Sequence, residues 1–365
     1  MLFWLGLLVT ALPALAIAAW LVVMHYYLRW KYVPMIARIF QEKPLFVVPR
    51  GRPVHDAEEV RFSTLDGRSL QGCYLRGRGR ERGRRGVILF GLEFGSNRWA
   101  CKAYCQTLLD HGYDVFTFES RGQGESEEEP GYHPLQWVTE YEVEDTLAAL
   151  AYLRSRDDAS PHGVGLFGIS KGAGAGVEAA VRDPSIRCIV TDGMFATYTT
   201  VVPYMRIWFR IYNNQFKLHG LLPSCYYGLV GLAALKRIEQ ERHCRFPPLE
   251  RALKGLGDRP ILMIHGGADA YIKPDMARDL FELIRGPKEL WMVEGAKHNG
   301  SLHVAGEEYG RRVLEFFDRH LAVSPDGLPK ALGSREPRDS ARVIPFAPRT
   351  FPADQGLPRR IAVPD

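Results

Sequence analysis

One stretch of the sequence decides the fold: VGLFGISKGAGAG, residues 164–176. A short apolar run leads directly into the pentapeptide Gly168-Ile169-Ser170-Lys171-Gly172, and the residues after it have almost no side-chain bulk. The apolar run is typical of a strand buried on both faces. Small residues on both sides of a serine allow a sharp, strained turn and a helix packed closely against the sheet. We therefore predict a strand, a turn that exposes the Ser170 hydroxyl, and a helix; the alternative is a structural glycine-rich turn.

Short apolar runs on both sides of this stretch indicate a mostly parallel sheet, because strands covered by helices are apolar throughout. Two earlier alternating segments, separated by Asp66-Gly67, predict an antiparallel hairpin. Between the runs, apolar residues recur every three or four positions, which predicts helices on both faces of the sheet. The predicted hairpin strands are 60–64 and 70–75, the buried strands are 87–90, 115–118, 164–167, 186–190, 261–264 and 290–293, and the helices are 99–109, 138–153, 173–181, 276–284 and 309–321. The fold class is therefore α/β.

Two further buried strands end in groups that could activate a serine. A serine hydroxyl is a weak nucleophile that needs a base, and the base needs an acid that orients it. Asp269 follows the strand at 261–264, in His265-Gly266-Gly267-Ala268-Asp269, and His298 follows the next strand. We therefore predict that Ser170, His298 and Asp269 act together, with Asp192, which also follows a buried strand, as the alternative acid.

The order Ser, Asp, His along the chain resembles the α/β-hydrolase superfamily. The resemblance extends to the segment Glu59–Gly67, to SRGQGES at 120–126 and to the His-Gly-x-x-Asp loop at 265–269. It covers roughly residues 54–321 and is strongest with the membrane-anchored serine hydrolases, the serine aminopeptidase and esterase-like branch. It implies an α/β-hydrolase fold and acyl transfer through a covalent acyl-enzyme.

The sequence departs from the family after the third strand, where a His-Gly pair is common and this chain has GLEFGSN at 91–97. An oxyanion hole needs only backbone N–H groups there. By position we predict the N–H of Phe94, paired with the N–H of Lys171 directly after the serine. Glu93 is either a local hydrogen-bonding group or a charge that shapes substrate choice.

About 70 residues separate the strand ending at 190 from the one starting at 261, which is too long for a simple crossover. This aromatic segment predicts a helical, lid-like insertion at 197–250. Trp208 and Phe209 are the candidate contacts for a substrate acyl chain. Alternatively, these aromatic residues only pack the insertion onto the domain or rest on the bilayer.

The two ends of the chain differ from its middle. Residues 2–24 carry no charge and are long enough to span a hydrocarbon core as a helix, so we predict a transmembrane anchor at 2–28. A cleaved signal peptide is the alternative. Arg29, Lys31 and Arg38 follow the apolar run, which favours a cytoplasmic catalytic domain. We predict a juxtamembrane linker at 29–53, a hydrolase domain at 54–321 and a disordered proline-rich tail at 322–365.

The net charge of +5 does not indicate a nucleic-acid partner, because the segment 76–85 alone carries six arginines and one glutamate. Such a segment is typical of a solvated hairpin loop, or of a contact with anionic lipid near the anchor. The six cysteines are too sparse for a disulfide scaffold, which fits reduced thiols. The sequence has no metal-ligand motif and no nucleotide-binding motif, so we expect no cofactor.

Together these observations predict a membrane-anchored serine hydrolase that cleaves a small-molecule acyl ester, and the aromatic insertion favours a lipophilic acyl group. An acyltransferase or a peptidase on the same fold is the enzymatic alternative. A catalytically silent, membrane-bound interaction protein is the alternative outside the enzymes, since a fold alone does not establish an activity.

Overall fold

A computed structural model describes residues 2–42, 48–78, 83–212 and 224–322, and within the helices it leaves undescribed the side chains of 2–10, 28, 202, 206–212, 224 and 225. The predicted proline-rich tail lies almost entirely outside these residues.

The described residues form an eight-stranded sheet with the strand order β1-β2-β4-β3-β5-β6-β7-β8. Strand β2 pairs antiparallel with β1 and with β4, whereas all other neighbours are parallel. The predicted hairpin and the predicted parallel strands are confirmed. The bounds are β1 (Glu58–Ser63), β2 (Ser69–Leu75), β3 (Gly86–Gly91), β4 (Tyr113–Phe118), β5 (Val164–Ile169), β6 (Ile186–Asp192), β7 (Ile261–Gly266) and β8 (Lys288–Val293).

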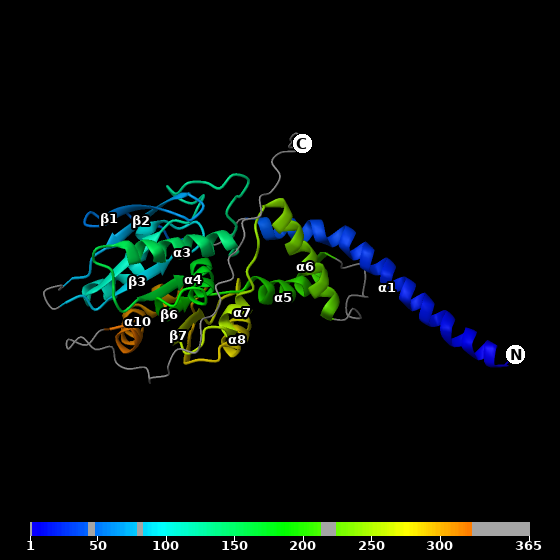
Figure 1. Cartoon of the computed structure of the whole chain (residues 1–365). Coiled ribbons are helices and arrows are strands. Elements are labelled where there is room, and N and C mark those ends of the chain that lie inside the picture. The colour runs from blue at the N-terminus through cyan, green and yellow to red at the C-terminus, as the bar shows by residue number, and fades with distance from the viewer. Residues whose placement is uncertain (1, 43–47, 79–82, 213–223, 323–365) are drawn as a thin grey trace, which may run out of the picture. The chain divides into compact units, whose positions relative to one another are not determined.

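Helices cover both faces of the sheet, and α3 and α4 lie along one of these faces in Figure 1. That face also carries α7 and α8, while α2 and α10 cover the opposite face with a core rich in aromatic side chains. Each apolar strand run is therefore buried from both sides, as its sequence predicts. The bounds are α2 (Cys101–Asp110), preceded by the short helix η2 (Arg98–Ala100), α3 (Glu140–Ser155), α4 (Lys171–Ala180), α7 (Leu249–Lys254), α8 (Pro274–Leu283), α9 (Ser301–Ala305) and α10 (Glu307–His320).

All five predicted helices begin two residues away from the predicted start, and for two of them the structure gives a local reason. Helix α3 begins at Glu140 because Thr139 and Glu142 form a capping box in which the Thr139 N–H donates to the Glu142 carboxylate at 2.8 Å. Helix α4 begins at Lys171, directly after Ser170, because no residue separates the serine turn from the helix.

The first helix, α1 (Leu2–Gln41), continues well past the predicted anchor and into the predicted linker. Its last turns are buried: Tyr32, Ile36 and Phe40 have exposed fractions of 0–1%. The Phe40 ring stacks on Trp137 at 4.4 Å, and the Trp137 indole N–H donates to the Phe40 carbonyl at 2.9 Å. The helix extends because these apolar residues, spaced by four, find a packing surface on the domain.

Within the described part of the chain, Ala11–Gln41 is the one helix that is long and apolar enough to cross a membrane, a property that signal sequences share. The predicted insertion contains α5 (Thr197–Tyr212) and α6 (Ser224–Glu241), followed by α7. Helices α1, α5 and α6 contribute to one apolar cluster together with Trp137 and Phe195.

Candidate active site

Ser170 occupies a strained turn between β5 and α4. Its φ of 50° and ψ of −114° are unusual for a residue with a side chain, and its N–H donates to the Asp192 carbonyl at 2.8 Å. The glycines around it are sterically required. A Cβ on Gly172 would lie 2.3 Å from the Gly91 carbonyl carbon, and a Cβ on Gly168 would lie 2.4 Å from the Ala173 Cα.

Three predicted residues lie in hydrogen-bonded series at the carboxyl ends of their strands. The Ser170 Oγ lies 3.0 Å from the His298 Nε2, and the His298 Nδ1 lies 2.7 Å from the Asp269 Oδ2. The other Asp269 oxygen, Oδ1, accepts the N–H groups of Tyr271 and Ile272, both at 2.8 Å. The carboxylate is therefore fixed so that Oδ2 faces the imidazole.

The loop that carries Asp269 is itself held by His265. The His265 Nε2 lies 2.8 Å from the Ile272 carbonyl, and burial lowers the pKa of His265, so a neutral ring donates this hydrogen bond. The His298 ring packs near two aromatic rings, with centroid distances of 5.2 Å to Tyr271 and 6.4 Å to Phe195. These contacts limit the rotation of the imidazole.

The alternative acid, Asp192, has other partners. Its carboxylate accepts the Ser301 hydroxyl at 2.9 Å and the Tyr309 hydroxyl at 3.0 Å, and burial raises its pKa to about 6. His303 is exposed on α9, and Asp275 lies in the first turn of α8, where a carboxylate stabilises free helix N–H groups. The structure thus pairs His298 with Asp269.

Glu93, in the loop after β3, is 3% exposed, and burial raises the pKa of its carboxyl to about 8. The Asn299 amide nitrogen donates to one carboxyl oxygen, and the Tyr104 hydroxyl lies 3.5 Å from the other. Sequence reasoning missed Asn299, whose only sequence signal is its position after His298. Its φ is 55°, so the segment that carries the histidine is also strained.

The two predicted oxyanion donors belong to neighbouring segments, since the Lys171 ammonium lies 5.5 Å from the Phe94 ring centroid. Lys171 is the first residue of α4, and a helix leaves its first four N–H groups without an acceptor within the helix. The Lys171 Nζ forms a buried ion pair with Glu142 at 2.8 Å and donates to the Leu135 carbonyl at 2.6 Å. These contacts fix the start of the helix.

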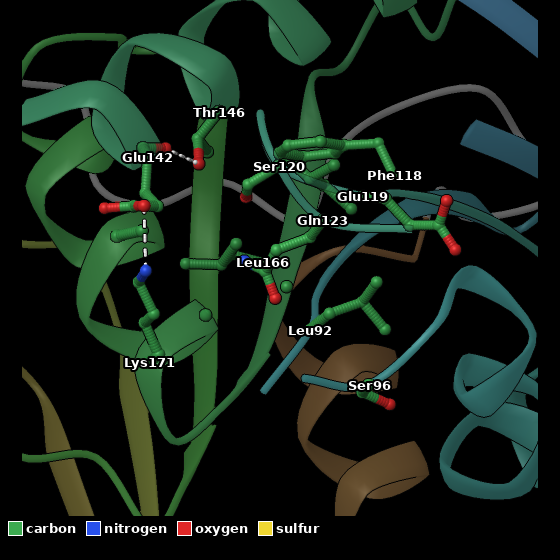
Figure 2. A pocket seen from close by; sticks show the side chains of 14 residues that line it. Leu92, Ser96, Phe118, Glu119, Ser120, Gln123, Glu142, Thr146, Leu166 and Lys171 are labelled. Atoms are coloured by element: carbon green, nitrogen blue, oxygen red, sulfur yellow. Dashed lines mark hydrogen bonds and ion pairs between the residues drawn. The ribbon is translucent and has the colours of Figure 1, made fainter. Parts of the chain in front are cut away.

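Figure 2 shows Lys171 and Glu142 at one side of a pocket that reaches the loop after β3 at Leu92 and Ser96. Gln123 lines the same pocket, and its side-chain oxygen accepts the Gly95 N–H at 3.0 Å. The Gln123 side chain thus supports the loop on which the predicted oxyanion donor lies.

The insertion contacts the loop that carries Asp269. The Tyr204 hydroxyl of α5 donates to the Tyr271 carbonyl, and α5 packs against α6. Trp208 and Phe209, the candidate acyl contacts, are in the last turns of α5, and their side chains lie outside the described residues. Their predicted role stays a prediction.

Comparisons with known proteins agree with the fold. A family model described as alpha/beta hydrolase fold matches residues 87–216. The uncharacterized protein YfhR of Escherichia coli K12 is 26% identical over 265 residues, covering 71% of this chain and 80% of its own. The polyketide transferase claH of Penicillium crustosum is 22% identical over 307 residues, covering 73% of this chain and 98% of its own.

Solved structures show the same fold. The Pyrococcus furiosus esterase Pf2001 has a TM-score of 0.55 at 22% identity, and the match covers 77% of this chain and all of that one. The acylaminoacyl peptidase of Pyrococcus horikoshii has a TM-score of 0.53 at 18% identity, over 73% of this chain and 41% of that one. With the sheet order, the strained serine turn and the family match over residues 87–216 taken together, the chain has the α/β-hydrolase fold.

Proposed function

We propose that this protein is a serine hydrolase that cleaves a carboxylic ester through a Ser170-His298-Asp269 triad and an acyl-enzyme. The observation that carries the proposal is the series of hydrogen bonds from the Ser170 Oγ through both nitrogens of His298 to Asp269. A hydrolase fold with this series has a nucleophile, a base and an orienting acid in one place.

The reaction follows from this arrangement. The Ser170 Oγ attacks the acyl carbonyl while the His298 Nε2 takes its proton, and the oxyanion forms against the N–H groups of Lys171 and Phe94. His298 then protonates the leaving alkoxide, which departs as an alcohol and leaves the acyl group on Ser170. A water molecule, deprotonated by His298, releases the acid and restores the serine.

We expect a lipophilic acyl group, because the insertion beside the site is apolar and aromatic where its side chains are described. Acyl transfer to an alcohol or thiol is the second candidate. It is favoured by the similarity to the polyketide transferase claH. Adding an acceptor alcohol separates the two, because a transferase forms a new ester at the expense of free acid.

Purified full-length protein and its Ser170→Ala and His298→Ala variants test the proposal on p-nitrophenyl esters of increasing chain length. Both variants should lose at least about 10³-fold in kcat, since triad residues act as a unit. His303→Ala is the matched control, because that histidine is exposed on the neighbouring helix α9. Full activity in the Ser170→Ala variant would refute the proposal, and an inactive wild type with a native melting transition would favour the interaction protein.

We further propose that α1 anchors the protein in a membrane in a single pass, with the hydrolase domain in the cytoplasm. The support is the apolar helix Ala11–Gln41 and the basic residues Arg29, Lys31 and Arg38 on its domain side. The protein should stay with the membrane during alkaline extraction. Protease added to closed inverted vesicles should digest the domain, whereas protease added to intact cells should leave it whole.

A further inference from the structure

The environment of α1 changes along its length. Between Leu12 and Val23 the large apolar side chains are mostly exposed, for example Leu15 at 66% and Val23 at 66%. From Tyr32 onward the helix is packed into the domain, with Tyr32 and Ile36 at 0%. An exposed apolar helix needs hydrocarbon around it and a helix packed on protein does not. With the membrane placement proposed above, the boundary of the bilayer would fall between these two parts, near Tyr26–Trp30.

Helix α6 lies beside α1 across this boundary and runs parallel to it. Near its start, the Tyr226 hydroxyl donates to the Leu21 carbonyl at 3.3 Å, and the ring centroids of Tyr226 and His25 are 6.5 Å apart. At its end, the Gln41 side-chain nitrogen donates to Glu241 at 2.9 Å. The first turns of α6 are thus level with the last exposed turns of α1.

The outer side of α6 is ordered from apolar to basic in the same direction. Leu229 and Leu232 are 50% and 48% exposed, although they are large aliphatic side chains. Lys236 is exposed one turn further along. With a rise of about 1.5 Å per residue, these three residues lie roughly 5, 9 and 15 Å beyond Tyr226 along the axis of α6. This is the order in which a leaflet presents acyl chains and then headgroups.

Side chains of α1 complete this surface and line a groove with α6. Trp30 is 77% exposed, as expected for an aromatic residue at a membrane interface. Arg29 and Lys236 form no ion pair with a carboxylate of the described residues, whereas Arg237 pairs with Glu241 at 2.7 Å. We call this surface the interfacial face; its members are Tyr26, Arg29, Trp30, Leu229, Leu232 and Lys236.

We propose that the interfacial face docks onto the leaflet that α1 leaves, with the two leucines among the acyl chains and the cations Arg29 and Lys236 at the phosphates of anionic phospholipids. This inference rests on the membrane placement proposed above. It makes the insertion, and not only the anchor, a membrane-bound element.

Spin labels on the full chain in vesicles of phosphatidylcholine and phosphatidylserine test the docking. The five cysteines that the structure describes are free and buried, so the labels go on Leu232→Cys or Val304→Cys in a Cys225→Ser background. Val304 is the matched control, because it is 49% exposed but lies on α9. Molecular oxygen, which concentrates in bilayers, should relax the label at 232 more than a water-soluble nickel chelate does. The label at 304 should show the reverse.

A third label at Leu15 separates the two ways in which the idea can fail. If the labels at 232 and 304 are equally accessible to nickel while the label at 15 is in the bilayer, the docking is refuted and the anchor stands. If the label at 15 is in water as well, both the docking and the membrane placement are refuted.

The phosphate contact has its own test. Protein is extracted from nanodiscs with equal amounts of the two lipids, and the lipids retained are identified by native mass spectrometry. Arg29→Gln with Lys236→Gln should reduce the retention of phosphatidylserine by about fivefold per cation. The control is Arg311→Gln with Arg312→Gln, which removes the same charge from α10. Equal retention by the two double variants would refute the anionic headgroup contact.

Discussion

Replacing Glu93 by glutamine should change how stability depends on pH. Burial raises the pKa of Glu93 from 4.5 to about 8 in the folded protein. The folded protein therefore holds a proton on Glu93 that the unfolded chain has already lost. This contribution to stability is fully present below pH 4.5 and is lost as the pH rises through about 8.

The size of the effect follows from the difference between the two pKa values of Glu93. At roughly 1.4 kcal/mol per pH unit, the difference of about 3.5 units corresponds to at most ~5 kcal/mol of stability. Relaxation and entry of water around the ionised carboxylate should reduce this to about 2–3 kcal/mol. Glutamine keeps an oxygen that can accept from Asn299 but does not ionise. The free energy of unfolding of Glu93→Gln, relative to that of wild type, should therefore rise by this amount between pH 5 and pH 9.

Urea unfolding at several pH values measures this difference. The assay of ester hydrolysis adds a second readout, because an ionised Glu93 lies on the predicted oxyanion loop and close to Asp192, Tyr104 and Asn299. Because Glu93 ionises in this range, wild-type kcat should fall at least about threefold between pH 7.5 and pH 9. The kcat of the glutamine variant should not fall in this way.

Glu178 provides the matched control for the role of Glu93. Burial raises its pKa to about 7, but it lies in α4, where Arg182, Glu140 and Glu250 are its charged neighbours. Glu178→Gln should change the pH dependence of stability and leave that of kcat as in wild type. If the difference in free energy of unfolding between wild type and Glu93→Gln is the same at all pH values, the reasoning is refuted.

Two further substitution pairs test the geometry of the site. Gly172→Ala should lower the free energy of unfolding in urea by about 3 kcal/mol, because its Cβ would meet the backbone of Gly91. Gly228→Ala should raise it by up to about 1 kcal/mol, because its Cβ would meet nothing within 4 Å. Equal effects of the two substitutions would argue against the close packing at Gly172. Asp269→Asn should reduce kcat by about 10³-fold or more, and Asp192→Asn should retain far more activity. If Asp192→Asn is the more damaging, the pairing of His298 with Asp269 is wrong.

The parallel sheet could be predicted because each buried strand is an apolar run and each is followed by a turn or a helical period. The predicted strands at 164–167 and 261–264 appear as β5 and β7, extended by two residues each. The proximity of Ser170, Asp269 and His298 could also be inferred, because parallel strands end at one edge of the sheet.

The contact between Glu93 and Asn299 could not be predicted, because it joins residues 206 positions apart through a strained backbone turn. The length of α1 was missed for a similar reason. Residues after the anchor were expected to be a linker, since the sequence does not indicate that Phe40 meets Trp137. Helical propensity alone leaves such a segment undecided, and tertiary packing stabilises it.

The central claim is that Ser170 is the nucleophile, and covalent labelling tests it most directly. A fluorophosphonate probe reacts with a serine hydroxyl only when a base activates it. After incubation with the full-length protein and digestion with trypsin, tandem mass spectrometry locates the phosphonyl group. We predict one modified site, Ser170, with labelling lost in the His298→Ala variant. A phosphonyl group on another serine, or labelling of Ser170 that is unchanged in His298→Ala, would contradict the account.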